Sequence, residues 1–393
     1  MKKIISVFLI LFQLSLWSSD SLETKPAYWN GNGFQVHGRF YAQMASQQVD
    51  DPTIYFEPYG FACYGHALLD GVLPLYVMLK KFNLLNSPIN LAIRLTSHEV
   101  SNQTVRNMLQ LIKDVFHFKN IVVLNSDEMH KRVYFKALIS LDFQKNYSSY
   151  YRSFPESFNY ITALKSFGMQ DNIVFQDANT SENITKEFIE FITSAYGIKT
   201  SMIKNRVLIP DRRYARKIVN LNELVQNLRA NGYDAVVLDF ENIPIKEQII
   251  HTMQAEYLMG TYGSNLVNAI FLHPEANVVV LWHKYSKYFW SRKYCIIHSA
   301  FLSKGVKLIE FDQADYDSRN VYTEGVHVPE YFYRQDNKNY LRAEKSSLDE
   351  IVKYPLPAQY EITNVDLYIQ PNQVVELLDK AKYLHNEPCQ IGR

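Results

Sequence analysis

The sequence predicts an α/β protein built from two domains, and three observations lead to that prediction. The chain has 393 residues, a length at which proteins normally form two domains. Its hydrophobic fraction of 47% is ordinary for a globular protein. Short runs of β-branched residues alternate with helical patterns in both halves, and in the second half this alternation indicates a parallel, doubly wound sheet.

The first half of the chain, after a polar segment at 20–32, alternates between short strands and helices. The clearest helix is 63–82, whose apolar residues share one face: Ala67, Leu68, Val72, Leu75 and Leu79. The strands expected are Phe34–Tyr41, Thr53–Tyr59, Ile89–Leu95, Ile121–Leu124 and Tyr134–Ser140, with a second helix at Val105–Phe116. We therefore expect an α/β domain over 33–180, ending in an aromatic, weakly periodic stretch typical of a lid or an interdomain crossing.

A helix at Thr185–Tyr196 leads to the second half, where the alternation is sharper. The strands expected are Arg206–Ile209, Ala235–Asp239, Tyr257–Gly260 and Asn277–Trp282, and the helices are Leu221–Ala230, Lys246–Ala255 and Leu266–Leu272. Gly232 is placed to close the first of these helices and Pro244 to open the second. These elements predict a second domain over 200–345, followed by an extension over 346–393 with a terminal helix at Val375–Leu384.

The N-terminus has the pattern of a signal peptide over residues 1–19. Lys2 and Lys3 precede an apolar run that is too short for a comfortable membrane span and ends in small residues. Because Trp17 is a poor residue beside a cleavage site, an uncleaved membrane anchor stays open, as does a buried N-terminal helix. We expect a protein of the secretory pathway, or one associated with a membrane through this segment.

Charge and cysteine content exclude several functions. Lysine plus arginine number 41 and aspartate plus glutamate 40, so no overall basic field points to nucleic acid as a partner. The three cysteines allow at most one internal disulfide, and their spacing fits no zinc site. A local basic cluster in such a neutral chain favours a local anion site.

Two motifs follow strands of the second half and point to such a site. Arg212, Arg213 and Arg216 come just after one strand, and guanidinium groups match the charge and geometry of a diphosphate. The turn Tyr262-Gly263-Ser264-Asn265 follows another strand and opens a helix, where Ser264 or Asn265 could cap the helix and exposed amides favour an anion. A solvated loop and an ordinary tight turn are the alternative explanations.

Other candidates are less specific. Glu247 and Gln248 lie on the helix between the two motifs, and could contact ribose hydroxyls or be ordinary helix surface. His66 and Asp70 are four residues apart on one helix face, which suits a general base oriented by a carboxylate, although a core histidine fits equally. Asp315-Tyr-Asp317 matches a minimal cation-binding pattern in a polar loop, so we expect no metal site there.

Taken in order, these segments resemble the family 61 glycosyltransferases. The resembling residues are Gly65-His66 with Asp70 and Leu73-Pro-Leu-Tyr76, Arg212-Arg213 with Arg216 and Asn220, Glu247-Gln248, and Gly260-Thr-Tyr-Gly-Ser-Asn-Leu-Val-Asn268. The resemblance implies a GT-B-like fold, with two Rossmann-type domains facing a cleft. It also implies an inverting transfer from a nucleotide-diphosphate sugar, with a UDP-sugar expected, to a glycan or glycoprotein acceptor, without a cofactor or metal.

Carried over residue by residue, the resemblance places the donor phosphates on Arg212, Arg213 and Arg216. It places the nucleotide over Tyr262, Gly263, Ser264, Asn265 and Asn268, with Glu247 and Gln248 supporting the site, and makes His66 with Asp70 the candidate base. The family usually has His-Gly-Ala-Gly at 262–265, so this chain replaces a histidine and a glycine. An inactive, glycan- or nucleotide-binding relative is therefore the alternative function.

Overall fold

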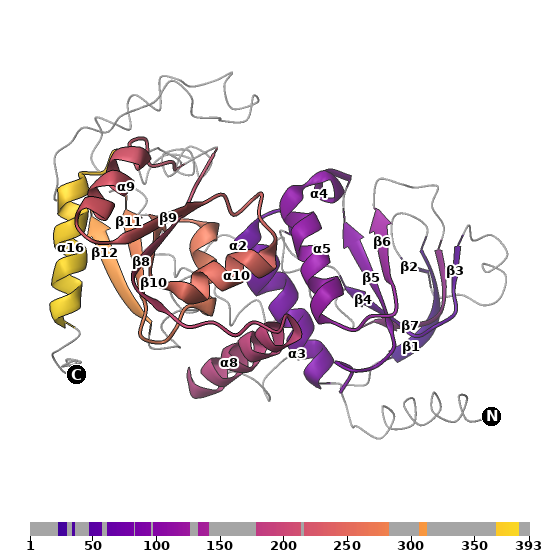
Figure 1. The fold of residues 1–393 in the computed structure, drawn as a ribbon. Coiled ribbons are helices and arrows are strands. Elements are labelled where there is room, and N and C mark those ends of the chain that lie inside the picture. Colours follow the sequence, from indigo (N-terminus) through magenta and orange to yellow (C-terminus); the bar gives the residue numbers. More distant parts are fainter. Residues whose placement is uncertain are drawn as a thin grey trace, which may run out of the picture. The chain divides into compact units, whose positions relative to one another are not determined.

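A computed structural model describes residues 23–29, 34–35, 47–56, 61–81, 83–95, 97–125, 133–140, 178–213, 216–282, 306–312 and 367–384. The described residues form two compact units, one ending at Gly197 and the other beginning at Ile198. Each unit contains a mainly parallel sheet with helices (Figure 1). The α/β class and the presence of two parallel-sheet units are thus confirmed.

The first unit is built on a seven-stranded sheet. Its strands are β1 (Glu23–Trp29), β2 (Phe34–Gln35), β3 (Gln47–Val49), β4 (Thr53–Phe56), β5 (Asn90–Leu95), β6 (Ile121–Asn125) and β7 (Val133–Ser140). The order is β2-β1-β7-β4-β5-β6, with β3 also pairing β7. The strands β3 to β7 pair in parallel, and the chain order reverses between β4 and β7.

Strand β1 lies in the polar segment at 20–32, where the sequence pattern indicated no strand. It pairs antiparallel with β7, and its register shifts between Lys25 and Ala27, around Pro26. Proline has no N–H to donate, so a strand that contains it is accommodated by a bulge near the margin of a sheet. This segment is a strand because its backbone pairs with that of β7, which is distant in the sequence. No local sequence pattern indicates a strand there.

Helices of the first unit are α2 (Tyr64–His66), a π-helical turn η2 (Ala67–Val72), α3 (Leu73–Lys81), α4 (Ser97–Ser101), α5 (Gln103–Val115) and α8 (Ala178–Ala195). The expected helix at 63–82 therefore exists, with a wider turn inserted. Helix α8, which leads out of the unit, packs into it: Phe188 and Phe191 contact Tyr76, with ring centroids 5.5 and 5.1 Å away.

The second unit contains a five-stranded, all-parallel sheet in the order β12-β11-β10-β8-β9. Its strands are β8 (Ile203–Pro210), β9 (Asp234–Leu238), β10 (Ala255–Thr261), β11 (Asn277–Trp282) and β12 (Lys307–Asp312). Strand β12 was not expected, because the sequence pattern weakens after 285. The chain winds from β8 to one side and then to the other, so β8 and β10 flank the switch point, beside which ligands bind at the carboxyl ends.

Helices α9 (Leu221–Ala230), α10 (Ile245–Gln254) and η3 (Ser264–Phe271) connect these strands. The punctuating residues act as expected: Pro244 is the N-cap of α10, and Gly232 follows α9 with a φ of 82°. The positive φ at Gly232 is a conformation that glycine adopts without a steric penalty.

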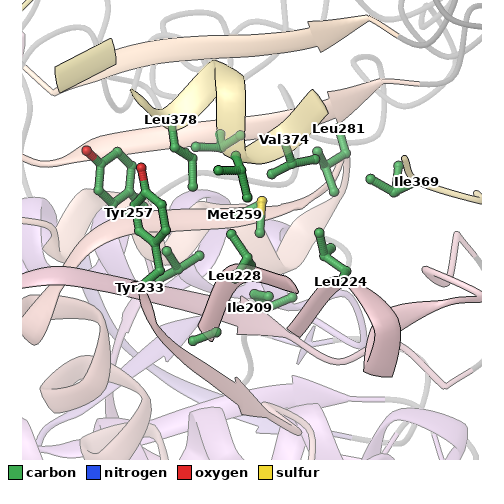
Figure 2. Packing of buried hydrophobic residues seen from close by; sticks show 14 of the residues in the cluster. Ile209, Leu224, Leu228, Tyr233, Tyr257, Met259, Leu281, Ile369, Val374 and Leu378 are labelled. Atoms are coloured by element: carbon green, nitrogen blue, oxygen red, sulfur yellow. The ribbon is translucent and has the colours of Figure 1, made fainter. Parts of the chain in front are cut away.

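Helix α16 (Pro371–Leu384) completes the core of the second unit (Figure 2). Val374 and Leu378 of this helix and Ile369 before it are buried in one cluster with Leu228 of α9 and Met259 of β10. Across the sheet the cluster takes alternate residues of each strand, which is the period of a pleated strand. The terminal helix expected at Val375–Leu384 is thus present, and it forms a layer of this unit.

Within the part of the chain that the structure describes, no helix is both long and apolar enough to cross a membrane. The expected signal segment at 1–19, the stretch at 147–177, Asp315, Asp317, Cys295 and Cys389 lie outside the described residues. Cys63 is an exposed free thiol.

Candidate functional site

The arginines and the glycine turn meet at the switch point of the second sheet. The loop that carries the arginines follows β8, and Gly263 follows β10; we call residues 211–220 the arginine loop. Because β8 and β10 are neighbouring parallel strands, their carboxyl ends lie at the same edge. Strand order therefore brings together two motifs that are about 50 residues apart, at the edge where α/β proteins bind ligands.

Arg216 is tied to the end of β10 by two hydrogen bonds. Its Nη1 donates to the carbonyl oxygen of Tyr262 at 2.8 Å, and its own carbonyl oxygen accepts from Thr261 Oγ1 at 2.7 Å. The backbone of Arg216 has a φ of 57°, which is uncommon for a residue other than glycine. Backbone strain of this kind persists only where the surroundings hold it, and it clusters at functional sites.

Gly263 is the point where two guanidinium groups converge. A Cβ atom placed on Gly263 would overlap Arg212 Nη1, and would lie 3.2 Å from Arg212 Cζ and 3.3 Å from Arg216 Nη1. The absence of a side chain at Gly263 thus makes room for both arginines. Two positive groups beside one backbone turn repel each other, and a bound anion would relieve that repulsion.

The helix after this turn differs from expectation. It is a 3₁₀ helix over Ser264–Phe271, Gly263 is its N-cap, and no side chain caps it. The expectation that Ser264 or Asn265 caps an α-helix is therefore wrong. Gly263 is extended, with φ 161° and ψ −179°, so the chain enters the helix one residue earlier than the cap pattern suggests. Ser264 and Asn265 are half-buried at the start of the helix.

Arg213 has a partner that the sequence pattern did not reveal. Its Nη2 forms an ion pair with Asp239 Oδ2, just past β9, and the two side chains are 54% and 19% exposed. Asp239 also accepts from Glu241 N at 3.1 Å and from Asn242 Nδ2 at 2.6 Å. Asp239 therefore orients Arg213. In the sequence, the signal for this ion pair was the position of Asp239 directly after a strand. That signal is informative only once the strand order places β9 beside β8.

Tyr262, at the position of the usual family histidine, has its ring in the core. Tyr262 is 5% exposed, and its ring stacks on that of Trp282, with centroids 4.5 Å apart and planes at 15°. Trp282 Nε1 donates to Glu310 Oε1 at 2.8 Å. The backbone carbonyl of Tyr262, which accepts from Arg216, is the part of this residue that contributes to the arginine site.

The remaining residues that were predicted to bind the nucleotide-sugar donor fall into two groups. Gln248 and Asn268 are buried: Gln248 Nε2 donates to the carbonyl oxygens of Phe240 and Ile243 at 2.7 and 3.1 Å, and Asn268 Nδ2 donates to Asn265 O at 3.2 Å. These contacts fasten the loops on either side of the site. Glu247, in contrast, is exposed in the first turn of α10. Ligand contacts for these residues stay predictions.

In the first unit, His66 ends α2 and Asp70 lies in the π-helical turn that follows. The helix follows β4 along the chain, and β4 lies at that sheet's switch point. Single π-helical turns inside helices are frequent at functional sites. Burial, with Glu187 and Glu190 nearby, raises the pKa of the Tyr76 hydroxyl to about 12, so this group stays protonated at neutral pH.

A hollow of about 670 Å³ opens at the opposite, amino edge of the first sheet, lined among others by Asp51, Asn90 and Asn120. Ligands of parallel α/β sheets usually lie at the carboxyl edge, so we place the candidate site at the switch point of the second sheet, where the arginines converge. Among the described residues, no group of three or more His, Cys, Asp or Glu is arranged to hold a metal ion.

A doubly wound sheet with arginines converging at its switch point is an arrangement with which α/β proteins typically bind phosphorylated ligands. Residues 64–279 match the family model described as Glycosyltransferase 61, and the chain belongs to this family. The match contains every residue that carried the resemblance seen in the sequence.

The chain is 28% identical over 121 residues to the EGF domain-specific O-linked N-acetylglucosamine transferase of Drosophila melanogaster. The aligned part is 30% of this chain and spans only 23% of that protein. A solved glycosyl transferase family 9 structure from Veillonella parvula aligns over 86% of this chain and 97% of its own. Its TM-score of 0.37 and identity of 10% are too low to bear on fold or function.

The packing at Gly263 makes a direct prediction for Gly263→Ala. The new methyl group must displace the flexible Arg212 guanidinium, so we expect the fold to survive and nucleotide binding to weaken about tenfold or more, as for the loss of one charge-assisted hydrogen bond. Isothermal titration with UDP measures the change. Gly260→Ala is the control, because its Cβ would meet only ordinary neighbours at 3.4 and 3.7 Å. Equal affinities in the two variants would contradict the role of Gly263.

Proposed function

We propose that the chain is an inverting glycosyltransferase that takes a sugar from a nucleotide-diphosphate donor, with a UDP-sugar as the expected donor, and transfers it to a hydroxyl group of a glycan or protein. The observation that carries the proposal is the convergence of Arg212 and Arg216 on Gly263 at the switch point. Membership of family 61 and the similarity to an O-linked N-acetylglucosamine transferase support it. The secretory pathway or a membrane surface is the proposed location.

In the proposed reaction, the acceptor oxygen attacks C1 of the donor sugar while the C1–oxygen bond to the diphosphate breaks. A base takes the acceptor proton, and His66 is the proposed base because its helix follows the switch-point strand β4. The departing diphosphate gains negative charge, which Arg212, Arg213 and Arg216 stabilise with guanidinium donors. Electrostatic stabilisation of this kind contributes about 3 to 4 kcal/mol per donor to the transition state.

A second candidate is a binding protein that keeps the fold and has lost turnover. The specific observation in its favour is Tyr262, whose ring replaces the usual family histidine and is stacked in the core. This protein would bind a glycan, or a nucleotide through the arginines, while no sugar would be transferred or hydrolysed from any donor.

A panel of UDP, GDP, CMP and their sugar conjugates tests the proposal. Each ligand at about 100 times its Kd adds roughly 2.7 kcal/mol of stability, which a thermal melt detects. We expect one nucleotide class to raise the melting temperature of the wild type, and Arg213→Ala to lose that increase and sugar transfer. Arg229→Ala is the matched control, because Arg229 hydrogen-bonds Ala235 O, away from the arginine loop.

The outcomes separate the two candidates. Binding with transfer supports the enzyme, and binding without transfer or donor hydrolysis supports the binding protein. If no nucleotide stabilises the wild type, the anion site at Gly263 is not a donor site. The transferase and a nucleotide-binding protein then both fail, and a glycan-binding protein is the candidate left.

A further inference from the structure

The arginine loop runs beside a segment that is about 150 residues further along the chain. Ile218 and Leu367 form a parallel β-bridge. Leu367 N donates to Lys217 O at 2.7 Å, and Val219 N donates to Leu367 O at 2.8 Å. The end of the arginine loop is therefore paired like a short strand, although it lies outside the five-stranded sheet.

Asn220 extends this pairing with its side chain. Its Oδ1 accepts from Ile369 N at 3.0 Å, and its Nδ2 donates to Ile369 O at 2.7 Å. One amide thus engages both backbone groups of one residue, as a neighbouring strand would. Nδ2 also donates to Glu223 Oε2 at 2.9 Å, and Glu223 accepts from Tyr368 Oη at 3.2 Å.

The segment to which Asn220 is hydrogen-bonded is itself buried in the core. Leu367 and Ile369 are 3% and 0% exposed, and both belong to the core cluster of the second unit. Helix α16 follows directly and packs on α9 and β12. The arginine loop is therefore paired with a segment, residues 367–369, that belongs to the core of the second unit.

Arg216 lies between two attachments of the arginine loop. At the beginning of the loop, Asp211 N donates to Leu238 O at 2.8 Å, and Lys217 begins the paired end. The left-handed backbone of Arg216, with φ 57°, persists only if the surrounding structure holds it. The pairing with 367–369 starts at the next residue, so it constrains the direction in which the Arg216 guanidinium leaves the backbone.

We infer that Asn220 is a positioning residue for the nucleoside-diphosphate site: together with residues 367–369 it holds the end of the arginine loop and thereby the direction of Arg216. The inference rests on the proposed function, because it concerns the geometry of the donor site. It assigns the C-terminal segment a role in ligand affinity as well as in stability.

Asn220→Ala tests the inference, with Asn227→Ala as the matched control. Both asparagines lie at or in α9, and each donates to the C-terminal segment, Asn227 Nδ2 to Asn372 Oδ1 at 2.8 Å. The probe is UDP, or whichever of GDP and CMP the wild type binds. For Asn220→Ala we expect a Kd raised about tenfold, since small misplacements of a binding group have effects of that order or larger. Hydrogen exchange at the Val219 amide should accelerate as well. Asn227→Ala should keep the wild-type Kd within about twofold at a similar melting temperature.

Two results would overturn the inference, and they are distinguishable. If Asn220→Ala and Asn227→Ala have the same Kd while the wild type binds, Asn220 only stabilises the fold and the proposed function stands. If the wild type binds none of the nucleotides, the proposed function fails and the inference fails with it.

Discussion

Replacing Arg216 with glycine should reduce sugar transfer at least about 100-fold while leaving the second unit folded. The change removes a guanidinium from the site, a loss comparable to that of one donor that stabilises a developing charge. It also relieves the backbone, because glycine adopts a φ of 57° without a steric penalty. This relief of about 1 kcal/mol or more offsets the lost hydrogen bond to Tyr262 O, which contributes about 1 kcal/mol.

Steady-state transfer assays and thermal melts on the same samples measure both effects. Asn205→Gly is the matched control: Asn205 also has a positive φ, of 62°, but it lies near the amino end of β8. Its backbone N–H, which donates to Glu256, is retained in glycine. We expect the control to transfer sugar at the wild-type rate. An Arg216→Gly variant that stays active would show that Arg216 does not contact the donor.

Replacing Leu378 with alanine should destabilise the second unit by about 2 to 5 kcal/mol. Leu378 is fully buried in the cluster that joins α16 to α9 and the sheet, and alanine leaves a cavity there. A loss of this size lowers the melting temperature of a unit of this length by roughly 5 to 15 °C. Hydrogen exchange of the β10 amides reports the second unit separately from the first.

Lys380→Ala is the control for this substitution. Lys380 is exposed on the same helix, so its replacement should change stability by less than about 0.5 kcal/mol. Both variants introduce alanine, which has the highest helix propensity, so the difference between them measures burial alone. If the two variants have the same melting temperature, α16 does not complete the core. The segment 367–369 would then not be held by the packing of α16.

Much of the second unit follows from local sequence. The β-branched run at 277–282, the glycine at 232 and the proline at 244 place a strand and two helix ends correctly. These signals depend on intrinsic backbone preferences and on the period of apolar residues, which neighbouring residues set by themselves. The carboxyl ends of parallel strands lie at the same edge of a sheet. Because the arginines and Gly263 each follow a strand of the second half, they were expected at that edge.

Strand order and packing decided the rest of the site. The sequence places Arg213 in a basic cluster, but its partner Asp239 became visible only with β9 beside β8. Tyr262 occupies a motif position, yet its ring direction depends on Trp282, which belongs to the next strand. Asn220 belongs to the family pattern, but its hydrogen-bond partner Ile369 lies about 150 residues further along the chain.

What the sequence determined by itself was the class of fold, the family, and the two motifs at the ligand edge of the second sheet. The tertiary structure decided which backbone and side-chain groups hold those motifs in place. Local propensities specify elements over a few residues, whereas the contacts of Arg213, Tyr262 and Asn220 join residues from about 20 to 150 positions apart. Such contacts form only when the sheet is assembled, and their free energy comes from burial and pairing that no local pattern records.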